Sequence, residues 1–399
     1  MKPAVVFILV NVLLDAMGIG LIIPVMPDLL TEVQGGSLAN AALWGGILST
    51  VFAVMQFVFG PALGSLSDRF GRRPILLISL AVMTLDYLVM AVAGSIWLLL
   101  AARMVGGITA ATQSTANAYM ADISKPEDKA ANFGLIGAAF GLGFVLGPLI
   151  GGLLGTFGTR APFYAAAALS GLNLLFGYFV LKETVTDRIR RPFTWGRANP
   201  VGAFRSVARL PGIGPLVFVY FLYSVAFNVY PSVWSYFTKA QFGWDPATIG
   251  LSLGLFGICM AIVQGGLIRL ILRTFGERGT VIYGHIFDMF VFAILGGLKN
   301  GLVALFMAPV SALGAVITPA LQGIMSKSVS DDAQGELQGL LSSANALAMI
   351  VAPLVMTSTF ALFSQEGAPL YLPGAPFFLS VILMIASLTV FLRARFSVT

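Results

Sequence analysis

Charged residues, histidine and cysteine are scarce in this chain. Only 10% of its 399 residues are charged, whereas 58% are hydrophobic; soluble domains carry about 25% charged residues. This composition excludes a soluble enzyme and a disordered protein. The single cysteine, Cys259, cannot form an internal disulfide, and the single histidine excludes a histidine-ligated metal centre.

Long hydrophobic runs fill most of the sequence. A helix that crosses the hydrocarbon core of a membrane needs about 20 mostly apolar residues. We therefore predict an all-α integral membrane protein with twelve transmembrane helices. The first run is too long for a signal peptide, so we interpret it as a mature helix. The predicted spans cover residues 4–26, 43–63, 74–94, 96–120, 133–156, 161–181, 213–236, 247–270, 280–298, 302–325, 337–363 and 373–393.

The positive charges lie mainly on one side of these spans. With the N-terminus inside, all but four of the 23 Lys and Arg residues fall in cytoplasmic segments. The exceptions are Arg103, within a span, and Arg160, Lys239 and Lys299 in outer loops. The positive-inside rule then predicts that both termini are cytoplasmic. The net charge of +6 reflects this bias toward the anionic inner leaflet of the bilayer, and it indicates no nucleic-acid partner.

A polar, basic segment divides the spans six and six. We predict an N-terminal six-helix half at 1–181, a cytoplasmic linker at 182–211 and a C-terminal six-helix half at 212–399. Parallel repeats of this kind place a substrate site between the halves, near the midplane of the membrane. An offset of 205 residues relates Phe70-Gly71 to Phe275-Gly276, Arg73 to Arg278, and Pro148-Leu149 to Pro353-Leu354.

Four ionisable residues lie where the hydrocarbon core of the membrane should be: Asp15, Asp86, Arg103 and Asp288. Each costs about 2.5–3.5 kcal/mol at the centre of a membrane helix, so a functional, inward-facing position is the default interpretation. Loss of water disfavours an ionised carboxylate, which suits an aspartate to loading and releasing protons. Arg103 keeps its proton and needs a carboxylate or carbonyl partner. The alternative is that these residues lie near a membrane interface and cap or snorkel.

Two segments have compositions that favour a change of conformation. The loop after the second span carries Gly64, Asp68, Arg69, Gly71, Arg72 and Arg73, whose glycines permit tight turns and whose charges can bridge facing helix ends. The alternative is an ordinary basic inner loop. The fifth span repeats small residues every four positions around Gly147-Pro148, which favours close helix contact and a kink.

Polar and aromatic side chains within the spans are candidates to line a cavity. These are Gln56, Gln113, Asn117, Gln264, Gln322 and Trp234, with interhelical hydrogen bonding or lipid packing as the alternative. His285 lies one turn before Asp288 on the same helix face. That pair could share a proton, and the alternative is a hydrogen-bonded packing histidine. No nucleotide-binding loop occurs, so ATP does not drive the protein directly.

The sequence resembles the major facilitator superfamily, and within it the tetracycline efflux proton antiporters. The Gly64–Arg73 loop has the superfamily's G-x3-D-R-x-G-R-R form, and Arg103-x2-Gly-Gly fits its fourth helix. The antiporter branch is matched by Leu14-Asp15-Ala16-Met17-Gly18, Asp86-Tyr87, Gly276-Glu277-Arg278, Pro319-Ala320-Leu321-Gln322 and Gln334-Gly335-x2-Gln338-Gly339. The resemblance implies proton coupling through Asp15, Asp86 and Asp288, with Arg103 as charge partner and Gln56 as a substrate residue.

One departure concerns the substrate. The family has a histidine in its eighth helix, where Met260 stands here. The stretch Ala111–Asn117 is also more polar than its family counterpart. We therefore expect Met260 and the neighbouring polar residues to affect which molecule is carried.

We predict a proton-coupled antiporter that exports a small drug-like molecule across the bacterial inner membrane, with tetracycline as a metal chelate among the candidates. We expect no permanently bound cofactor and no resident metal, although Mg²⁺ can travel with the substrate, and we expect a monomer. Two rivals remain open. The first is a proton-coupled transporter of an unrelated metabolite on the same fold, and the second is a membrane receptor that transports nothing.

Overall fold

The structure is a computed structural model that describes residues 3–110, 112–125, 128–186, 190, 210, 212–330, 333–368 and 370–394. Two predictions therefore fall outside the described residues. One is the side chain of Gln113, and the other is most of the linker at 182–211. The division of the chain at that linker stays a prediction.

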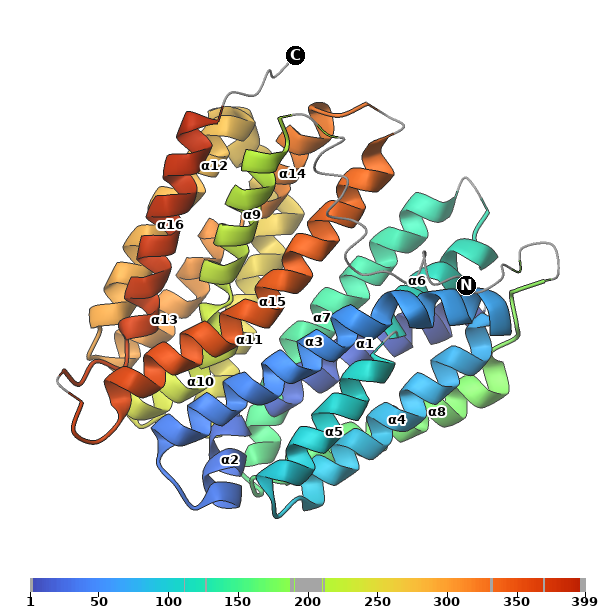
Figure 1. Ribbon diagram of the computed structural model, residues 1–399, viewed down its shortest axis with the longest axis horizontal. Helices are drawn as coiled ribbons and strands as arrows, with labels where there is room; N and C mark the ends of the chain where they lie inside the picture. The colour runs from blue at the N-terminus through green and yellow to red at the C-terminus, as the bar shows by residue number, and fades with distance from the viewer. Residues whose placement is uncertain are drawn as a thin grey trace. The chain divides into compact units, whose positions relative to one another are not determined.

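Every regular element in the described parts is helical (Figure 1). The helices of the first half are α1 (Pro3–Ile22), α2 (Met26–Gln34), α3 (Leu38–Phe70), α4 (Arg72–Val92), α5 (Ile96–Thr109), α6 (Thr112–Ile123), α7 (Lys129–Gly155) and α8 (Ala161–Val180). Those of the second half are α9 (Gly214–Phe227), α10 (Val229–Phe242), α11 (Pro246–Ile262), α12 (Ile268–Gly297), α13 (Gly301–Ser311), α14 (Ile317–Lys327), α15 (Gln334–Ser364) and α16 (Ala375–Arg393).

Eleven helical segments of the described chain are long and apolar enough to cross a membrane. One of them, Pro246–Gly297, contains two of the predicted spans. Within it a π-helical turn, Val263–Leu267, joins α11 to α12, and Gly276 leaves the helical conformation at φ 66° and ψ 175°. The chain bends at Gly276 because only glycine adopts such a conformation at low cost. The all-α, multi-span prediction is confirmed.

Four predicted spans are broken, which the hydrophobic pattern did not show. The first ends at Ile22 and a turn leads into α2; the others divide into α5 and α6, α9 and α10, and α13 and α14. The expectation of one continuous helix at 4–26, 96–120, 213–236 and 302–325 was wrong in this respect. The helix after each break is more polar than the helix before it, but a search for runs of about 20 mostly apolar residues averages over this difference and places no break there.

The helix boundaries repeat with the 205-residue offset found in the sequence. Three pairs of helices begin 205 residues apart: α5 at Ile96 and α13 at Gly301, α6 at Thr112 and α14 at Ile317, and α7 at Lys129 and α15 at Gln334. The two halves therefore share one sequence of helices and breaks. This agreement confirms the predicted pseudo-symmetry of the halves.

The chain forms two compact units that exchange short segments. Unit 1 comprises Met1–Gly35, Val51–Pro200 and Asp245–Gly254; unit 2 comprises Gly36–Thr50, Val201–Trp244 and Leu255–Thr399. In unit 1, α1 packs against α7 and α8, and α4 packs against α8. In unit 2, α9 packs against α15 and α16, and α12 packs against α16.

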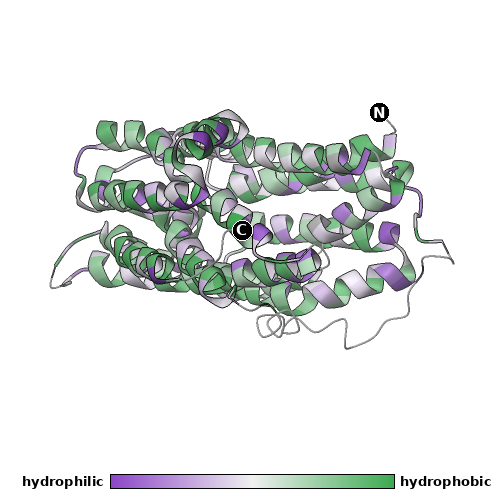
Figure 2. Ribbon diagram, turned by 90° about the horizontal axis from the view of Figure 1, so that it is seen from above, coloured by the Kyte–Doolittle hydropathy of each residue, from purple (hydrophilic) through white to green (hydrophobic). Residues whose placement is uncertain are grey.

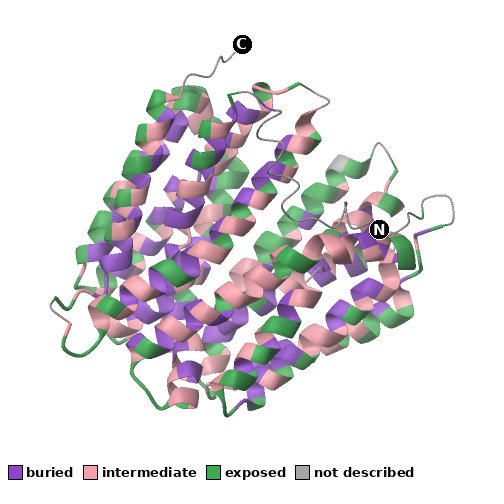
Figure 3. Cartoon of the chain, in the orientation of Figure 1, coloured by how far each residue is buried: buried purple, intermediate pink, exposed green. Residues whose placement is uncertain are grey.

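Hydrophobic residues predominate in the long helices (Figure 2), and many of them point outward. Phe157, Phe179 and Phe306 are 80%, 79% and 74% exposed. By contrast, more than half of the residues of α9 and α10 are buried (Figure 3). Exposed aromatic side chains in such number are unusual in water and normal against lipid.

Candidate functional site

An ion pair lies in the interior of unit 1. The Asp86 carboxylate on α4 pairs with the Arg103 guanidinium on α5, and their side chains are only 4% and 12% exposed. The guanidinium also lies 5.1 Å from the centre of the Phe52 ring. Gly106, on the next turn of α5, leaves the space that the carboxylate fills, because an added Cβ would lie 3.1 Å from its Oδ2. Arg103 thus neutralises Asp86 where water is scarce.

Asp15 lies on α1 of the same unit. One of its carboxylate oxygens is buried and has no hydrogen-bond partner among the described residues. Tyr87, which follows Asp86 in the chain, lies within electrostatic range of Asp15. Gly18 allows this approach, since a Cβ there would meet the Tyr87 phenol. Tyr87 therefore lies against α1 near Asp15, one residue along α4 from the acid that Arg103 neutralises.

Asp288 on α12 is the buried carboxylate of unit 2. The residue has 0% exposure, and neither carboxylate oxygen has a hydrogen-bond partner among the described residues. Its carboxylate occupies the space beside Gly314, where an added Cβ would meet it. Gly314 ends a short 3-10 turn, Ala312–Gly314, in the break between α13 and α14. The helix break and the missing side chain together make room for this acid.

Two tyrosines bracket Asp288. The Tyr223 and His285 rings are 6.1 Å apart, and the Tyr230 and Phe292 rings are 5.6 Å apart. Because both contacts join residues 62 positions apart, the two chain segments run parallel in one register, and Asp288 falls between the contacts. The Tyr230 hydroxyl is buried and has no partner among the described residues.

His285 uses both ring nitrogens. Nδ1 lies 2.8 Å from the Val281 carbonyl oxygen on its own helix, and Nε2 lies 2.9 Å from the Ser387 hydroxyl on α16. The residue has 0% exposure. The imidazole is therefore held inside unit 2, in contact with α9 and α16.

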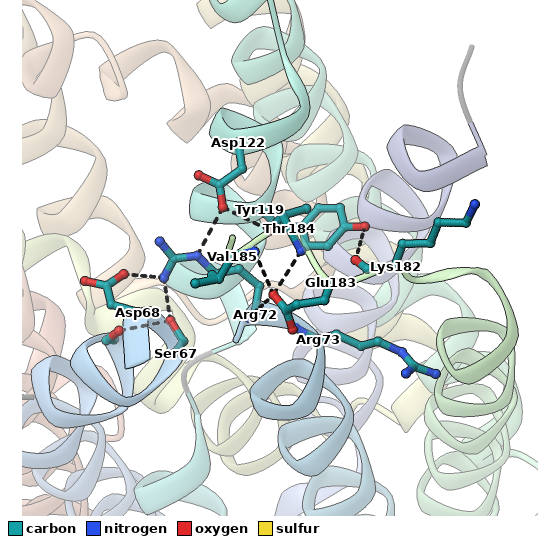
Figure 4. Close-up of polar contacts among 11 residues, drawn as sticks. Ser67, Asp68, Arg72, Arg73, Tyr119, Asp122, Lys182, Glu183, Thr184 and Val185 are labelled. Carbon is teal, nitrogen blue, oxygen red and sulfur yellow. Dashed lines mark hydrogen bonds and ion pairs between the residues drawn. The ribbon is translucent and has the colours of Figure 1, made fainter. Parts of the chain in front are cut away.

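The predicted gating loop forms a charged network around Arg72 (Figure 4). One terminal nitrogen of Arg72 lies 2.5 Å from the Asp68 carboxylate and 2.6 Å from the Ser67 hydroxyl. Its Nε lies 3.3 Å from the Asp122 carboxylate near the end of α6. Arg72 thus ties the α3–α4 loop to the helix that follows the Arg103 segment.

The other predicted gating residues differ in their surroundings. Arg73 donates to the Tyr178 carbonyl at 2.9 Å and lies 5.6 Å from the centre of its ring. Arg69 is exposed and lies over the Phe70 ring, while Gly64 has open space beside it. Asp68, Arg72 and Arg73 hold the loop through their side chains, while the Gly64 carbonyl accepts from the Ser67 hydroxyl at 2.9 Å and the Gly71 N–H donates to the Ser67 carbonyl at 3.1 Å.

Glu183 is a central residue of this network that the sequence analysis missed. Its carboxylate accepts hydrogen bonds from the backbone N–H groups of Arg72 at 2.9 Å and Arg73 at 3.2 Å, at the start of α4. Gly71, at φ 114°, leaves space for the carboxylate. A negative charge here stabilises the N-terminus of α4. An acidic residue directly after the sixth span was the available signal.

Gly147 and Pro148 lie where α7 meets α1. Added Cβ atoms at Gly143, Gly147 and Gly151 would each meet a backbone carbonyl of α1. These carbonyls belong to Leu13, Met17 and Leu21, which are also spaced by four residues. The glycines therefore form one continuous seam that lets the two backbones approach closely.

The predicted substrate-binding residues with described side chains are divided between the two units, with Gln56 and Asn117 in unit 1 and the others in unit 2. Gln56 is exposed and donates to the Ala110 carbonyl at the α5–α6 break, at 3.2 Å. Asn117 has a buried side-chain oxygen without a partner among the described residues. Trp234 is only 1% exposed and packs among the rings of Tyr230, Phe237, Trp244 and Phe377. Met260 and Gln322 are half-buried, and Gln264 is exposed in the π-helical turn.

The fold and these buried charges define a multi-pass membrane transporter, and comparison with known proteins identifies its family. The sequence profile of the Major Facilitator Superfamily matches residues 8–228 and 216–397. The chain belongs to that superfamily. It is a transporter of small molecules rather than an enzyme.

Several relatives are similar over nearly their whole length. Tetracycline resistance protein, class C, of Escherichia coli is 41% identical over 382 residues, which cover 94% of this chain and 96% of that protein. The class B protein of Escherichia coli is 35% identical over 94% of this chain and 93% of its own. The crystal structure of the human organic anion transporter MFSD10 has a TM-score of 0.70 and 27% identity, and covers 98% of this chain and 99% of its own.

Proposed function

We propose that the chain is a proton-coupled antiporter that exports a small drug-like molecule across the bacterial inner membrane by alternating access. The observation that carries this proposal is Asp288, a fully buried carboxylate without a hydrogen-bond partner among the described residues. Folding alone does not require a costly group of this kind inside a membrane. A carboxylate that binds and releases a proton during transport does require it.

The two units supply different electrostatic surroundings for their acids. Arg103 neutralises Asp86 in unit 1, and Asp15 lies within electrostatic range of the neighbouring Tyr87. A proton or a cationic substrate at these acids competes with the arginine for the carboxylate. Binding of the one then favours release of the other, which is the requirement of an exchanger.

The proton gradient supplies enough energy for export. A pH difference of one unit is worth about 1.4 kcal/mol per proton, and 100 mV adds about 2.3 kcal/mol per charge. Together they sustain a drug gradient of roughly a few hundredfold for one proton. No nucleotide hydrolysis is needed.

The substrate class follows from the relatives. Several proteins similar over most of this chain are named for tetracycline resistance, which favours a drug over an unrelated metabolite. We propose tetracycline, carried with Mg²⁺ as part of the cargo, as the first molecule to test. Met260 and the polar residues of α6 are the positions where this chain would select a different drug.

Three further features complete the proposal. The positive-inside distribution of Lys and Arg supports cytoplasmic termini. The bacterial sources of the tetracycline-resistance relatives support the inner membrane. We also propose that the protein works as a monomer.

Substrate-induced proton release tests the proposal. Purified protein in weakly buffered detergent near neutral pH is mixed with tetracycline and Mg²⁺, and then with a panel of other drugs. We expect protons to be released by the wild type and by Glu366→Gln, an exposed acid outside the helices, but not by Asp288→Asn. Normal release and normal vesicle export by a folded Asp288→Asn protein would overturn the proposal.

A further inference from the structure

The two buried acids have unequal charge partners. Asp86 pairs with Arg103 in unit 1. Neither carboxylate oxygen of Asp288 has a hydrogen-bond partner among the described residues, so no lysine or arginine of that part of the chain is paired with this acid. An ionised carboxylate without a counter-charge is strongly disfavoured in such surroundings. If Asp288 releases its proton, another group of unit 2 has to balance the charge.

The groups that face Asp288 limit which side chain can balance its negative charge. Tyr223 and Tyr230 bracket it from α9 and α10, and a tyrosine hydroxyl can donate a hydrogen bond but brings no positive charge. From the α13–α14 segment it meets Gly314. The charged pair of Lys327 and Glu277 is already matched within itself. Tyr283 on α12 is also within electrostatic range of Asp288 and brings no positive charge either. Among the described groups placed around Asp288, His285, one turn earlier on α12, is the side chain that can become a cation.

The contacts of His285 form a chain of hydrogen bonds that ends in a carbonyl. Nε2 meets the Ser387 hydroxyl at 2.9 Å, and that hydroxyl lies 3.2 Å from the Val219 carbonyl on α9. Nδ1 meets the Val281 carbonyl at 2.8 Å. Because a carbonyl only accepts, Nδ1 carries a hydrogen in every protonation state of the ring.

Counting hydrogens distinguishes the two states of His285. In the neutral ring Nε2 accepts a hydrogen bond, so the Ser387 hydroxyl donates its one hydrogen to the ring. The Val219 carbonyl then receives no hydrogen bond from Ser387. In the protonated ring Nε2–H donates to Ser387, and Ser387 donates to the Val219 carbonyl. All three contacts are then satisfied at once, and no heavy atom moves. The hydrogen-bonding partners accept either state, and more of their hydrogen bonds are satisfied when the ring is protonated.

We propose that His285 is the switchable counter-cation of Asp288, with Ser387 and the Val219 carbonyl as its hydrogen-bond acceptors. The bond between a proton and an Asp288 oxygen breaks, a bond between a proton and His285 Nε2 forms, and the net charge of the pair stays constant. The role of this pair in export rests on the proposed antiport. Its chemistry depends on unit 2 alone.

The single histidine permits a direct spectroscopic test. Full-length protein, labelled with ¹⁵N-histidine and purified through a tag without histidine, gives imidazole signals from one residue. Nitrogen chemical shifts separate the two neutral tautomers from the imidazolium. Over about pH 5–9, the range in which histidines and buried carboxylates titrate, we expect the Nδ1–H tautomer together with the doubly protonated form.

Two variants test the cause of that signal. We expect Asp288→Asn to lose the doubly protonated form, because the negative charge that it balances is gone. Ser387→Ala should lose it as well, because Nε2–H then has no acceptor. A ring that stays neutral throughout in the wild type, or that protonates equally in Asp288→Asn, would show that His285 only packs.

A transport measurement separates this inference from the proposed function. His285→Gln keeps an amide near Ser387 but cannot take up a proton. We expect the unfolding temperature of this variant to equal that of the wild type. We expect its drug-induced proton release to be lost. Full release by a folded His285→Gln protein would overturn the counter-cation role and leave antiport intact. A proton that moves between the two residues in a protein that exports no drug would refute the proposed function alone.

Discussion

The Lys327 ammonium lies 2.8 Å from a carboxylate oxygen of Glu277, and this ion pair repeats one of the first half with its charges exchanged. Glu277 and Lys327 stand 205 residues after Arg72 and Asp122, which are themselves paired at 3.3 Å. The pseudo-symmetry therefore preserves an ion pair and not the identity of its members. Each pair joins the start of one helix region to the last turn of another.

Exchanging the charges of the second pair tests whether the ion pair itself is what matters. Glu277→Lys places two cations together, and we expect reduced drug export with little loss of stability, since an exposed ion pair contributes only about 0–1 kcal/mol. The double variant Glu277→Lys with Lys327→Glu restores the opposition of charge and should recover export. Export that stays low in the double variant, measured in vesicles at equal protein amount, would mean that residue identity matters more than charge.

Removing the carboxylate of Glu183 should loosen the start of α4. Glu183→Ala leaves the Arg72 and Arg73 backbone N–H groups without their acceptor, and loss of a helix cap costs about 1 kcal/mol. We expect a lower unfolding temperature in detergent and weaker drug export. Glu32→Ala, which removes an exposed ion pair with Arg160, is the matched control. Equal effects of the two variants would argue against a special role for Glu183.

A methyl group added at the glycine seam between α1 and α7 should lower the stability of the protein. In Gly147→Ala the new Cβ would lie 2.6 Å from the Met17 carbonyl and 2.8 Å from the Gly20 Cα. Overpacking of this kind costs about 1–3 kcal/mol. Gly141→Ala lies on the same helix with open space beside it and should be harmless. Thermal unfolding of the two purified variants compares them, and equal stability would count against the close packing.

The Asp86–Arg103 pair should show strong coupling in a double-mutant cycle. Asp86→Asn leaves the buried guanidinium without its counter-charge, and breaking a buried pair costs about 3–5 kcal/mol. Adding Arg103→Gln removes the isolated charge and should recover most of the stability, but not proton-coupled export. The free energies of unfolding and the drug-induced proton release are measured on four proteins: the wild type, the two single variants and the double variant. Additive losses of stability would contradict the coupling.

Membrane placement and the internal repeat were predictable because their signals are local. A run of about 20 apolar residues defines a span wherever it occurs. The 205-residue register appeared in a few matched residues, such as Phe70-Gly71 and Phe275-Gly276, and the structure repeats it in three pairs of helix starts. The buried acids were also visible, since a charge inside an apolar run stands out.

The helix breaks and the role of Glu183 were not predictable from local pattern. The chain is more polar after Ala110 and after the Ala312–Gly314 turn than before them, but a search for long apolar runs averages over each span and does not mark where the helix ends. Glu183 reaches the N-terminus of α4 across 111 residues of sequence. A contact between residues so far apart in the chain produces no local sequence pattern from which it could be predicted.

Composition and charge by themselves determined that this chain spans a membrane many times, in two similar halves, with acids inside its helices. The physical reason is that lipid imposes the same requirement on every span, independent of its neighbours. Only the tertiary structure decided that Arg103 neutralises Asp86, that Asp288 lies against Gly314, and that His285 meets Ser387. These relationships depend on which helices pack together, and side chains far apart in the sequence meet only in the folded units.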